Sequence, residues 1–442
     1  MSSLKTSVLV LPTLLQYSSR ISNSNSSILK SSRFFMAVSG FMLYNSSMKA
    51  RYRYRFYPTD QQRQSLAQLF GCVRVVWNDA LAFCKQAEKL PKNGDLQKWI
   101  ITQAKKTTER EWLSEVSNIP LQQSVADLGV AYKNFFDSLK GKRKGKKLGA
   151  PRFKKKTGRQ LARFTRGGFS IQGESVYLAK IGDLQPVWSR ELPSIPSSVT
   201  VIKDASNRYF LSFVVDVEPV QVEAENQSIG IDLGIKTFAV MSNGSKAESP
   251  NYSALDRKVR KLQKQLARQQ KGSNRRHKTR IGIAGLHNQI ADTRKDFLHK
   301  LSTKVVSENK AIVLEDLNVS GMVKNRKLAR SISLQGWREF MTLCKAKSEK
   351  FGRVFTAIVR WEPTSQICSD CGFKWGKLDL KVRLIKCLSC GTEHDRDENA
   401  AKNINKVGIG HCHDSKRTQR QSKTTSVASV GEASRITAPL GR

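Results

Sequence analysis

Two Cys-x-x-Cys pairs constrain this 442-residue chain more tightly than any other feature of its sequence. Cys368 and Cys371 form the first pair, Cys387 and Cys390 form the second, and fifteen residues lie between the pairs. Such spacing is typical of a zinc ribbon, in which two short turns hold one metal ion among four sulfur atoms. Because four cysteines fill a tetrahedral site and leave no open position, we expect structural rather than catalytic Zn²⁺.

The other four cysteines show no metal-binding spacing. Eight cysteines are too few for a disulfide scaffold in a chain of this length. Cys72, Cys84 and Cys344 lie within apolar stretches, where a free cysteine behaves as a small hydrophobic residue. We therefore expect these three side chains in the hydrophobic core.

The balance of charged residues indicates a polyanionic partner. The chain has 77 Lys and Arg against 36 Asp and Glu, which gives a formal net charge of +41 at pH 7. Self-repulsion of this size opposes compaction, so nucleic acid or another polyanion is expected to bind. No run approaches the roughly 18–20 apolar residues that a transmembrane helix needs, so no membrane span is predicted.

Much of the positive charge lies in two tracts without acidic residues. Residues 140–166 contain thirteen Lys or Arg among 27 residues, and residues 257–280 contain eleven among 24. A solvated loop is the alternative for the first tract, but basic residues interleaved with aromatic ones favour a groove that follows a nucleic-acid backbone. The predicted nucleic-acid-binding residues are Lys142, Arg143, Lys144, Lys146, Lys147, Arg152, Phe153, Lys154, Lys155, Lys156, Lys258, Arg260, Lys261, Lys264, Arg268, Arg275 and Arg276.

Three carboxylates stand at the ends of apolar or helical segments. Asp232 lies within a predicted buried strand, where an uncompensated acid is costly. Glu315 closes the apolar run that begins at Ala311, and Asp397 precedes a helix predicted over 399–407. Carboxylates on separate elements of a polyanion-binding protein suit Mg²⁺, which prefers oxygen ligands. Two such ions about 3.5–4 Å apart can support phosphodiester hydrolysis.

Each acid also has a simpler structural interpretation. Asp395 or Asp397 can cap the helix that follows, because acids are favoured at a helix N-terminus. Glu315 or Asp316 can pair with a nearby Lys or Arg. The sequence therefore leaves open whether Asp395 or Asp397 is the third metal ligand.

The ends of the chain differ from its middle. Residues 1–47 contain fourteen Ser, four Lys or Arg and no acid, which fits either a transit peptide or a start codon placed too early. Met48 opens the first well-patterned segment, a strand over 51–57, and we take it as the functional start. Residues 59–139 read as helical, a basic helix or helix pair follows at 252–280, another helix at 287–307, and a disordered tail after 408.

Several blocks together resemble the TnpB (OrfB) family of transposon-encoded RNA-guided DNA endonucleases, which are related to type V CRISPR effectors. The resemblance covers about residues 48–408. The matching blocks are Arg51–Asp79 with its Phe-Gly-Cys-Val-Arg-Val-Val-Trp-Asn-Asp end, Gly230–Lys236, Val313–Leu317, Thr364–Gly372 and Asp395–Ile404.

The resemblance implies a mixed α/β fold with a ribonuclease H-like (RuvC) nuclease core, an inserted zinc ribbon, and an N-terminal β-barrel wedge domain interrupted by a helical recognition region. The implied segments are a non-native or disordered extension (1–47), the first wedge strand (48–58), the recognition region (59–139), the basic loop and rest of the wedge (140–227), the nuclease core (228–363), the ribbon (364–392), the third nuclease motif with its helix (393–408) and the tail (409–442).

The resemblance also implies an activity. Asp232, Glu315 and Asp397 match the family's three catalytic carboxylates, which would make the chain a metal-dependent endodeoxyribonuclease. Its implied cofactors are structural Zn²⁺ and catalytic Mg²⁺, with Mn²⁺ as the alternative ion. Its implied partners are a guide RNA and a target DNA, in the cytoplasm of a bacterial cell and associated with the nucleoid.

Three other functions remain as alternatives. A DDE-like transposase would use a similar acid triad on DNA ends without any RNA. A zinc-ribbon regulator would bind DNA through its basic surface without catalysis. A ribosome- or membrane-associated basic protein would account for the charge but not for the three ordered acids.

Overall fold

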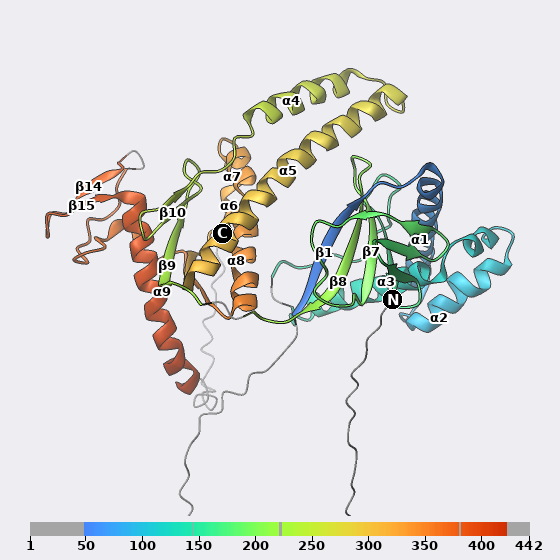
Figure 1. Ribbon diagram of the computed structural model, residues 1–442, viewed down its shortest axis with the longest axis horizontal. Coiled ribbons are helices and arrows are strands. Elements are labelled where there is room, and N and C mark those ends of the chain that lie inside the picture. Colours follow the sequence, from blue (N-terminus) through green and yellow to red (C-terminus); the bar gives the residue numbers. More distant parts are fainter. Residues whose placement is uncertain (1–47, 144, 221–222, 380–381, 422–442) are drawn as a thin grey trace, which may run out of the picture. The chain divides into compact units, whose positions relative to one another are not determined.

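A computed structural model describes residues 48–143, 145–220, 223–379 and 382–421, with side chains described as far as residue 410. Lys144 and the predicted extension at 1–47 lie outside the described residues, as does the part of the predicted tail from 422 to 442. Two mixed regions of sheet and helix make up the described chain, the first before and the second after residue 220 (Figure 1). None of the helices among the described residues combines the length and apolar character that a membrane crossing requires.

An antiparallel sheet of five strands organises the first region. Its order is β2-β7-β8-β1-β6, and alternate residues of β1, such as Tyr54 and Phe56, are buried against the core as the sequence alternation predicts. A smaller sheet has the order β3-β4-β5. The strands are β1 (Met48–Phe56), β2 (Gln160–Thr165), β3 (Phe169–Gln172), β4 (Ser175–Leu178), β5 (Gly182–Leu184), β6 (Pro186–Val187), β7 (Ser198–Lys203) and β8 (Tyr209–Val217).

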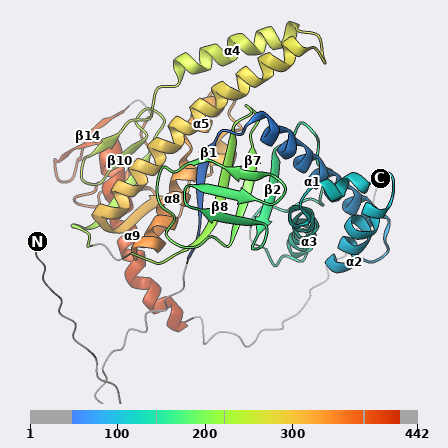
Figure 2. The same ribbon diagram turned by 45° about the vertical axis from the view of Figure 1, so that its right-hand side comes forward.

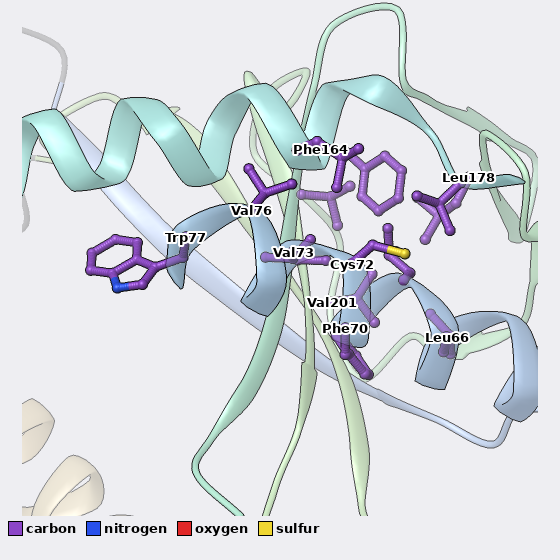
Figure 3. Close-up of a cluster of buried hydrophobic side chains, with 14 of the residues drawn as sticks. Leu66, Phe70, Cys72, Val73, Val76, Trp77, Phe164, Leu178 and Val201 are labelled. Carbon is purple, nitrogen blue, oxygen red and sulfur yellow. The ribbon is translucent and has the colours of Figure 1, made fainter. Parts of the chain in front are cut away.

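Helices α1 (Asp60–Gln86) and α3 (Asn118–Leu139) pack against these strands, and α2 (Asn93–Gln97) packs on α3. Thr59 caps α1, since its hydroxyl accepts the backbone N–H of Gln62 while the Gln62 side chain accepts the Thr59 N–H. Short π and 3-10 turns connect α2 to α3: Lys98–Gln103, Ala104–Lys106 and Glu111–Glu115. Figure 3 shows α1 side chains meeting those of the strands in one core, with Cys72 among them.

The second region is built on a mixed sheet with the order β11-β10-β9-β12-β13. Strand β10 runs antiparallel to β9, whereas β9, β12 and β13 are parallel. Helices cover both faces: Ile312 and Leu314 of β12 pack with α5 and α8, while Val313 between them packs with α9. The strands are β9 (Asn226–Leu233), β10 (Ala239–Met241), β11 (Lys246–Ala247), β12 (Asn309–Glu315) and β13 (Val354–Ile358).

Helices α4 (Ser253–Arg268) and α5 (Asn274–Glu308) form a hairpin that carries the second basic tract (Figures 1 and 2). Gly272 turns the chain between them with a φ of +89°, a conformation that glycine adopts without strain. The prediction of a separate helix at 287–307 was wrong, because α5 is one continuous helix of 35 residues. No proline interrupts it, and its two glycines, Gly282 and Gly285, are tolerated.

The remaining elements complete the second region. They are α6 (Val319–Met322), α7 (Ala329–Gln335), α8 (Trp337–Phe351), the 3-10 turn Thr364–Gln366, β14 (Leu384–Lys386), β15 (Glu393–Asp395) and α9 (Arg396–Gln421). The prediction that a disordered tail begins at 409 was wrong for its first thirteen residues, because α9 continues to Gln421. The helix was predicted to end at residue 407, just before Gly408. In the structure Gly408 lies within α9 and packs against the Val313 side chain of β12, and no proline follows it before Gln421.

Candidate active site and zinc ribbon

The three predicted acids come together at one edge of the second sheet. Asp232 lies near the end of β9 and Glu315 ends the neighbouring parallel strand β12, so both carboxylates reach the same edge. Asp397 lies in the first turn of α9, which packs across these strands. All three line a single pocket of about 410 Å³, which we call the acidic pocket.

Helix α9 can bring Asp397 to this edge because glycines let it approach the sheet closely. A methyl group at Gly230 of β9 would overlap the Ala401 carbonyl oxygen of α9, and one at Gly408 of α9 would overlap the Val313 side chain of β12. Glycine at both positions therefore sets the depth at which α9 sits on the strands.

The clustered negative charge changes the protonation of the site. The pKa of Asp232 is raised from 3.8 to about 7, first by removal from water and then by the charges of Asp397 and Glu315. Burial and the neighbouring Asp316 also raise the pKa of Glu315. Like charges held this close disfavour ionisation unless a cation offsets them. Three carboxylates that line one pocket are oxygen donors of the kind that a hard divalent cation such as Mg²⁺ prefers.

Neighbouring acids perform the structural roles that the sequence left open. Asp395 accepts the backbone N–H groups of Asp397 (2.9 Å) and Glu398 (3.2 Å), and it pairs with Lys246 at 2.9 Å. It therefore caps α9 and does not belong to the lining of the acidic pocket. Asp316 likewise pairs with Arg360 at 2.6 Å. Asp397 is the acid of its segment that faces Asp232.

Basic side chains also line the acidic pocket, and the sequence did not single them out. They are Lys236, Arg360, Arg383 and Arg396. Arg383 donates to both carboxylate oxygens of Asp397, at 2.8 and 2.9 Å. Lys236 ends one of the matching blocks, Arg383 lies in the predicted ribbon and Arg396 precedes Asp397, but nothing in the sequence marked Arg360, because isolated Lys and Arg are frequent in this chain.

The four predicted zinc ligands form one cluster. The sulfur atoms of Cys368, Cys371, Cys387 and Cys390 all lie within 4.8 Å of one another. Each pair closes a tight turn, in which the glycine after the pair donates its N–H to the carbonyl of the first cysteine and has a φ of +78° or +74°. Four sulfur donors at this separation fit Zn²⁺.

The sequence did not predict that His394 lies beside the cysteine cluster. It is buried in β15, and its Nε2 lies 3.1 Å from the Cys368 sulfur. In the tautomer that carries the proton on Nε2, His394 would donate to this sulfur and so act as an outer partner that orients a metal ligand. The five-residue pattern Cys390 to His394 gave no signal beyond an ordinary polar segment.

Helix α9 also holds the first cysteine turn. The Asn399 side chain accepts the Ser369 N–H at 2.7 Å and donates to the Ile367 carbonyl at 2.8 Å. Asn403 donates to the carbonyls of Thr364 (2.8 Å) and Ile367 (2.7 Å). These two amides are buried, so they replace water as partners of the turn. One helix thus carries Asp397 and holds the first turn of the four-cysteine cluster beside it.

The predicted nucleic-acid-binding residues divide into two groups. Five contact other side chains or carbonyls of the protein. Lys154 lies 3.7 Å above the Trp77 ring, Arg260 pairs with Asp256 at 2.8 Å, and Arg276 donates to carbonyls at the end of α4. Arg143 donates to the Asn134 side chain at 2.8 Å, and the Phe153 ring lies 4.5 Å from the Lys85 ammonium. The others that the structure describes are exposed, namely Lys142, Lys146, Lys147, Arg152, Lys155, Lys156, Lys258, Lys261, Lys264, Arg268 and Arg275.

Three family models match successive parts of the chain. A model described as a probable transposase matches residues 212–326, a Cas12f1-like TNB domain matches 337–404, and a helix-turn-helix domain matches 48–90. Residues 48–90 form β1 and the single helix α1 here, so the last description does not portray their local structure.

Known proteins resemble the chain over most of its length. A Streptomyces pristinaespiralis protein, provisionally named an RNA-guided DNA endonuclease, is 40% identical in a match that covers 89% of this chain and 99% of the relative. InsQ of Escherichia coli strain K12 has the same provisional name and is 30% identical in a match that covers 82% of this chain and 92% of InsQ. A Cas12f1 chain, solved with sgRNA and target DNA, has a similar fold (TM-score 0.51, 13% identity, covering 81% and 98%). On the strength of these two relatives and the transposase model, the chain belongs to the TnpB (OrfB) family.

Proposed function

We propose that the chain is an RNA-guided DNA endonuclease that hydrolyses DNA phosphodiester bonds in the acidic pocket. The observation that carries this proposal is the convergence of Asp232, Glu315 and Asp397 from three elements on one pocket. Relatives that span nearly the whole chain carry the same functional name. The net charge of +41 supplies the attraction for two nucleic acids.

The proposed architecture follows from the sheet order. An antiparallel strand pair that continues into parallel strands, with helices on both faces, supports a ribonuclease H-like (RuvC) core. In the sequence, the proposed ribbon then lies between the strand that carries Glu315 and the helix that carries Asp397. The five-stranded sheet of the first region would form the wedge barrel, with α1 to α3 as the recognition helices.

Within the acidic pocket, the chain's own residues would bind and orient the reactants. Asp232, Glu315 and Asp397 would hold Mg²⁺, or Mn²⁺ in its place, and the bound ions would activate water and stabilise the leaving oxygen. Arg383, which contacts Asp397, would be attracted to a substrate phosphate that enters the pocket. The four cysteines would hold Zn²⁺ away from the reaction, as a structural ion.

The basic tracts would hold the two nucleic acids by contacts to their phosphates. Such contacts give affinity and position but little sequence information. Pairing between a guide RNA and the target strand would supply most of the specificity, as in other RNA-guided effectors. The exposed basic face of α4 offers Lys258, Lys261 and Lys264 for this role.

The experiment is guided cleavage by single variants. The RNA that copurifies with the protein is sequenced, and a plasmid with the matching target is offered in the presence of Mg²⁺. Asp232→Ala, Glu315→Ala and Asp397→Ala should each reduce cleavage by at least about 100-fold, because even outer partners of a metal site cost about 10–100-fold. RNA binding should stay near that of the wild type.

Asp296→Ala is the matched control, because Asp296 is an exposed acid of α5 that pairs only with Lys300, at 2.8 Å. It should cleave like the wild type. Persistent cleavage by the three variants would reject the assigned site. Cutting that needs no RNA would favour a DDE-like transposase, and DNA-dependent regulation unchanged by Asp232→Ala would favour a non-catalytic zinc-ribbon regulator.

A further inference from the structure

A second pocket, of about 150 Å³, lies between α1 and the segment that leads into β2. Phe70, Val73 and Leu161 give it apolar walls. Its charged lining residues are all basic: Arg74, Lys154, Lys155 and Arg159. We call it the basic pocket. Two segments far apart in the sequence thus contribute cations to one small cavity.

The positive charge of the basic pocket is not offset by carboxylates. Among the described residues, no acid pairs with Arg74, Lys155 or Arg159, although Arg74 is half-buried. The acid whose charge acts on Lys154 is Asp127, and that carboxylate already pairs with Arg163. Like charges gathered in a cavity repel one another, so this arrangement favours a bound anion.

The protein holds Lys154 in place for such a ligand. Asn78 of α1 accepts the Lys154 N–H at 2.8 Å and donates to the Lys154 carbonyl at 3.1 Å. The Lys154 ammonium lies 3.7 Å from the centre of the Trp77 ring, whose own N–H donates to the Arg152 carbonyl at 3.0 Å. A bond from the Gly158 N–H to the Lys155 carbonyl closes the turn that follows. The Lys154 ammonium and the backbone turn that carries Lys155 are therefore held in place before a ligand binds.

We propose that the basic pocket binds one backbone phosphate of a nucleic acid, with Arg74 and Arg159 as ligands alongside Lys154 and Lys155. This proposal rests on the proposed function for its ligand class. A phosphodiester matches the cavity because it brings one negative charge and oxygen acceptors only, while all four charged groups are donors. The phosphate of the guide RNA and that of the DNA share this chemistry, and the experiment separates them.

The test compares Arg74→Gln/Arg159→Gln in the full-length protein with the wild type and with Lys89→Gln/Lys98→Gln. The control removes two exposed Lys charges from the same region but outside the pocket. Fluorescent single-stranded RNA and duplex DNA of equal length and mixed sequence are titrated separately over a range of salt concentrations. Loss of one phosphate contact should weaken binding about fivefold near physiological salt and make the salt slope shallower by about one.

Weakening in the RNA arm alone assigns the phosphate to RNA, and weakening in the DNA arm alone assigns it to DNA. The proposal is overturned if the pocket variant binds both probes like the wild type, or loses no more affinity than the control variant. Lys155→Gln, an exposed position, serves as a second variant should the double variant unfold. Guided cleavage by the wild type is measured in parallel, so that failure of the pocket and failure of the nuclease assignment give different results.

Discussion

Burial of the Asp232 carboxyl disfavours its charged form, which is the form that the proposed metal site needs. Its pKa of about 7 means that the folded protein retains a proton which the unfolded chain releases near pH 3.8. Between these two values the folded state binds more protons, so the free energy of unfolding falls as pH rises and levels off above about pH 7. A metal ion must displace that proton, so its affinity should increase through the same range.

Asp232→Asn should consequently stabilise the metal-free protein. At pH 8 we expect a gain of about 2 kcal/mol, roughly half of what a shift of this size gives without solvent screening. The gain should shrink as pH falls towards 4, because the wild-type carboxyl then becomes neutral as well. Thermal unfolding in the presence of a chelator, across this pH range, measures it. A gain that does not depend on pH would contradict the electrostatic cause.

At the scale of elements, the contact between β9 and α9 sets the geometry of the acidic pocket. Gly230→Ala should force α9 away from the strand, because the added methyl group meets the Ala401 carbonyl. Overpacking of this kind costs about 1–3 kcal/mol, and a small displacement of Asp397 should lower cleavage at subsaturating Mg²⁺. Denaturant unfolding and Mg²⁺ titration of cleavage measure the two effects.

Gly71→Ala is the control for this variant. Gly71 lies in α1 with open space where a Cβ would stand, so alanine there should stabilise the helix by up to about 1 kcal/mol and leave cleavage unchanged. Equal behaviour of the two variants would show that close packing at Gly230 is unimportant.

The zinc ribbon and the acidic pocket share the 3-10 turn Thr364–Gln366, which lines the pocket and is held by Asn403. Asn403→Leu should leave zinc in place yet reduce cleavage about 10–100-fold, since it frees the Thr364 carbonyl, leaves Asn399 as the remaining side-chain donor to the Ile367 carbonyl, and lets the turn move. Cys368→Ser should lose both zinc and cleavage. Elemental analysis and guided cleavage distinguish the two variants.

Lys402→Ala is the control on α9, because the half-buried Lys402 side chain has Glu398, at 3.1 Å, as its single acidic partner among the described residues. It should keep zinc and activity. Full activity of Asn403→Leu would mean that the ribbon and the pocket are independent, and loss of zinc from this variant would mean that Asn403 supports the metal site instead.

For the whole molecule, the net charge of +41 predicts an unusual response to salt. Protein freed of nucleic acid should gain thermal stability as ionic strength rises from low to moderate, because screening reduces self-repulsion. The complex with RNA should show the opposite trend, since salt releases the ligand that stabilises it. Scanning calorimetry of both forms measures the difference, and parallel salt responses would contradict it.

Sequence reasoning succeeded where the signal was local. The cysteine spacing predicted one sulfur cluster, and the alternation of residues 51–57 predicted β1. It grouped Asp232, Glu315 and Asp397 as one candidate metal site, and the family resemblance gave them a catalytic role, but their spatial arrangement was not predictable because contacts between distant segments leave no periodic trace. The roles of Asn399 and Asn403, and the proximity of Arg74 and Arg159 in the basic pocket, went unnoticed for the same reason. The helix predicted over 399–407 was too short because α9 continues through Gly408, which packs against Val313.

Helix α9 carries Asp397, Asn399 and Asn403 within seven residues; Asp397 lines the acidic pocket, whereas the two amides hold the segment from Thr364 to Ser369. A helix turns by about 100° per residue, so one residue added or removed between Asp397 and Asn403 would swing the acid away from the sheet or the amide away from the ribbon. No side-chain replacement elsewhere could restore both. Insertions and deletions in this stretch should therefore be tolerated far less than substitutions on its exposed face. The number of residues between Asp397 and Asn403 is thus more strictly required than the identity of those residues.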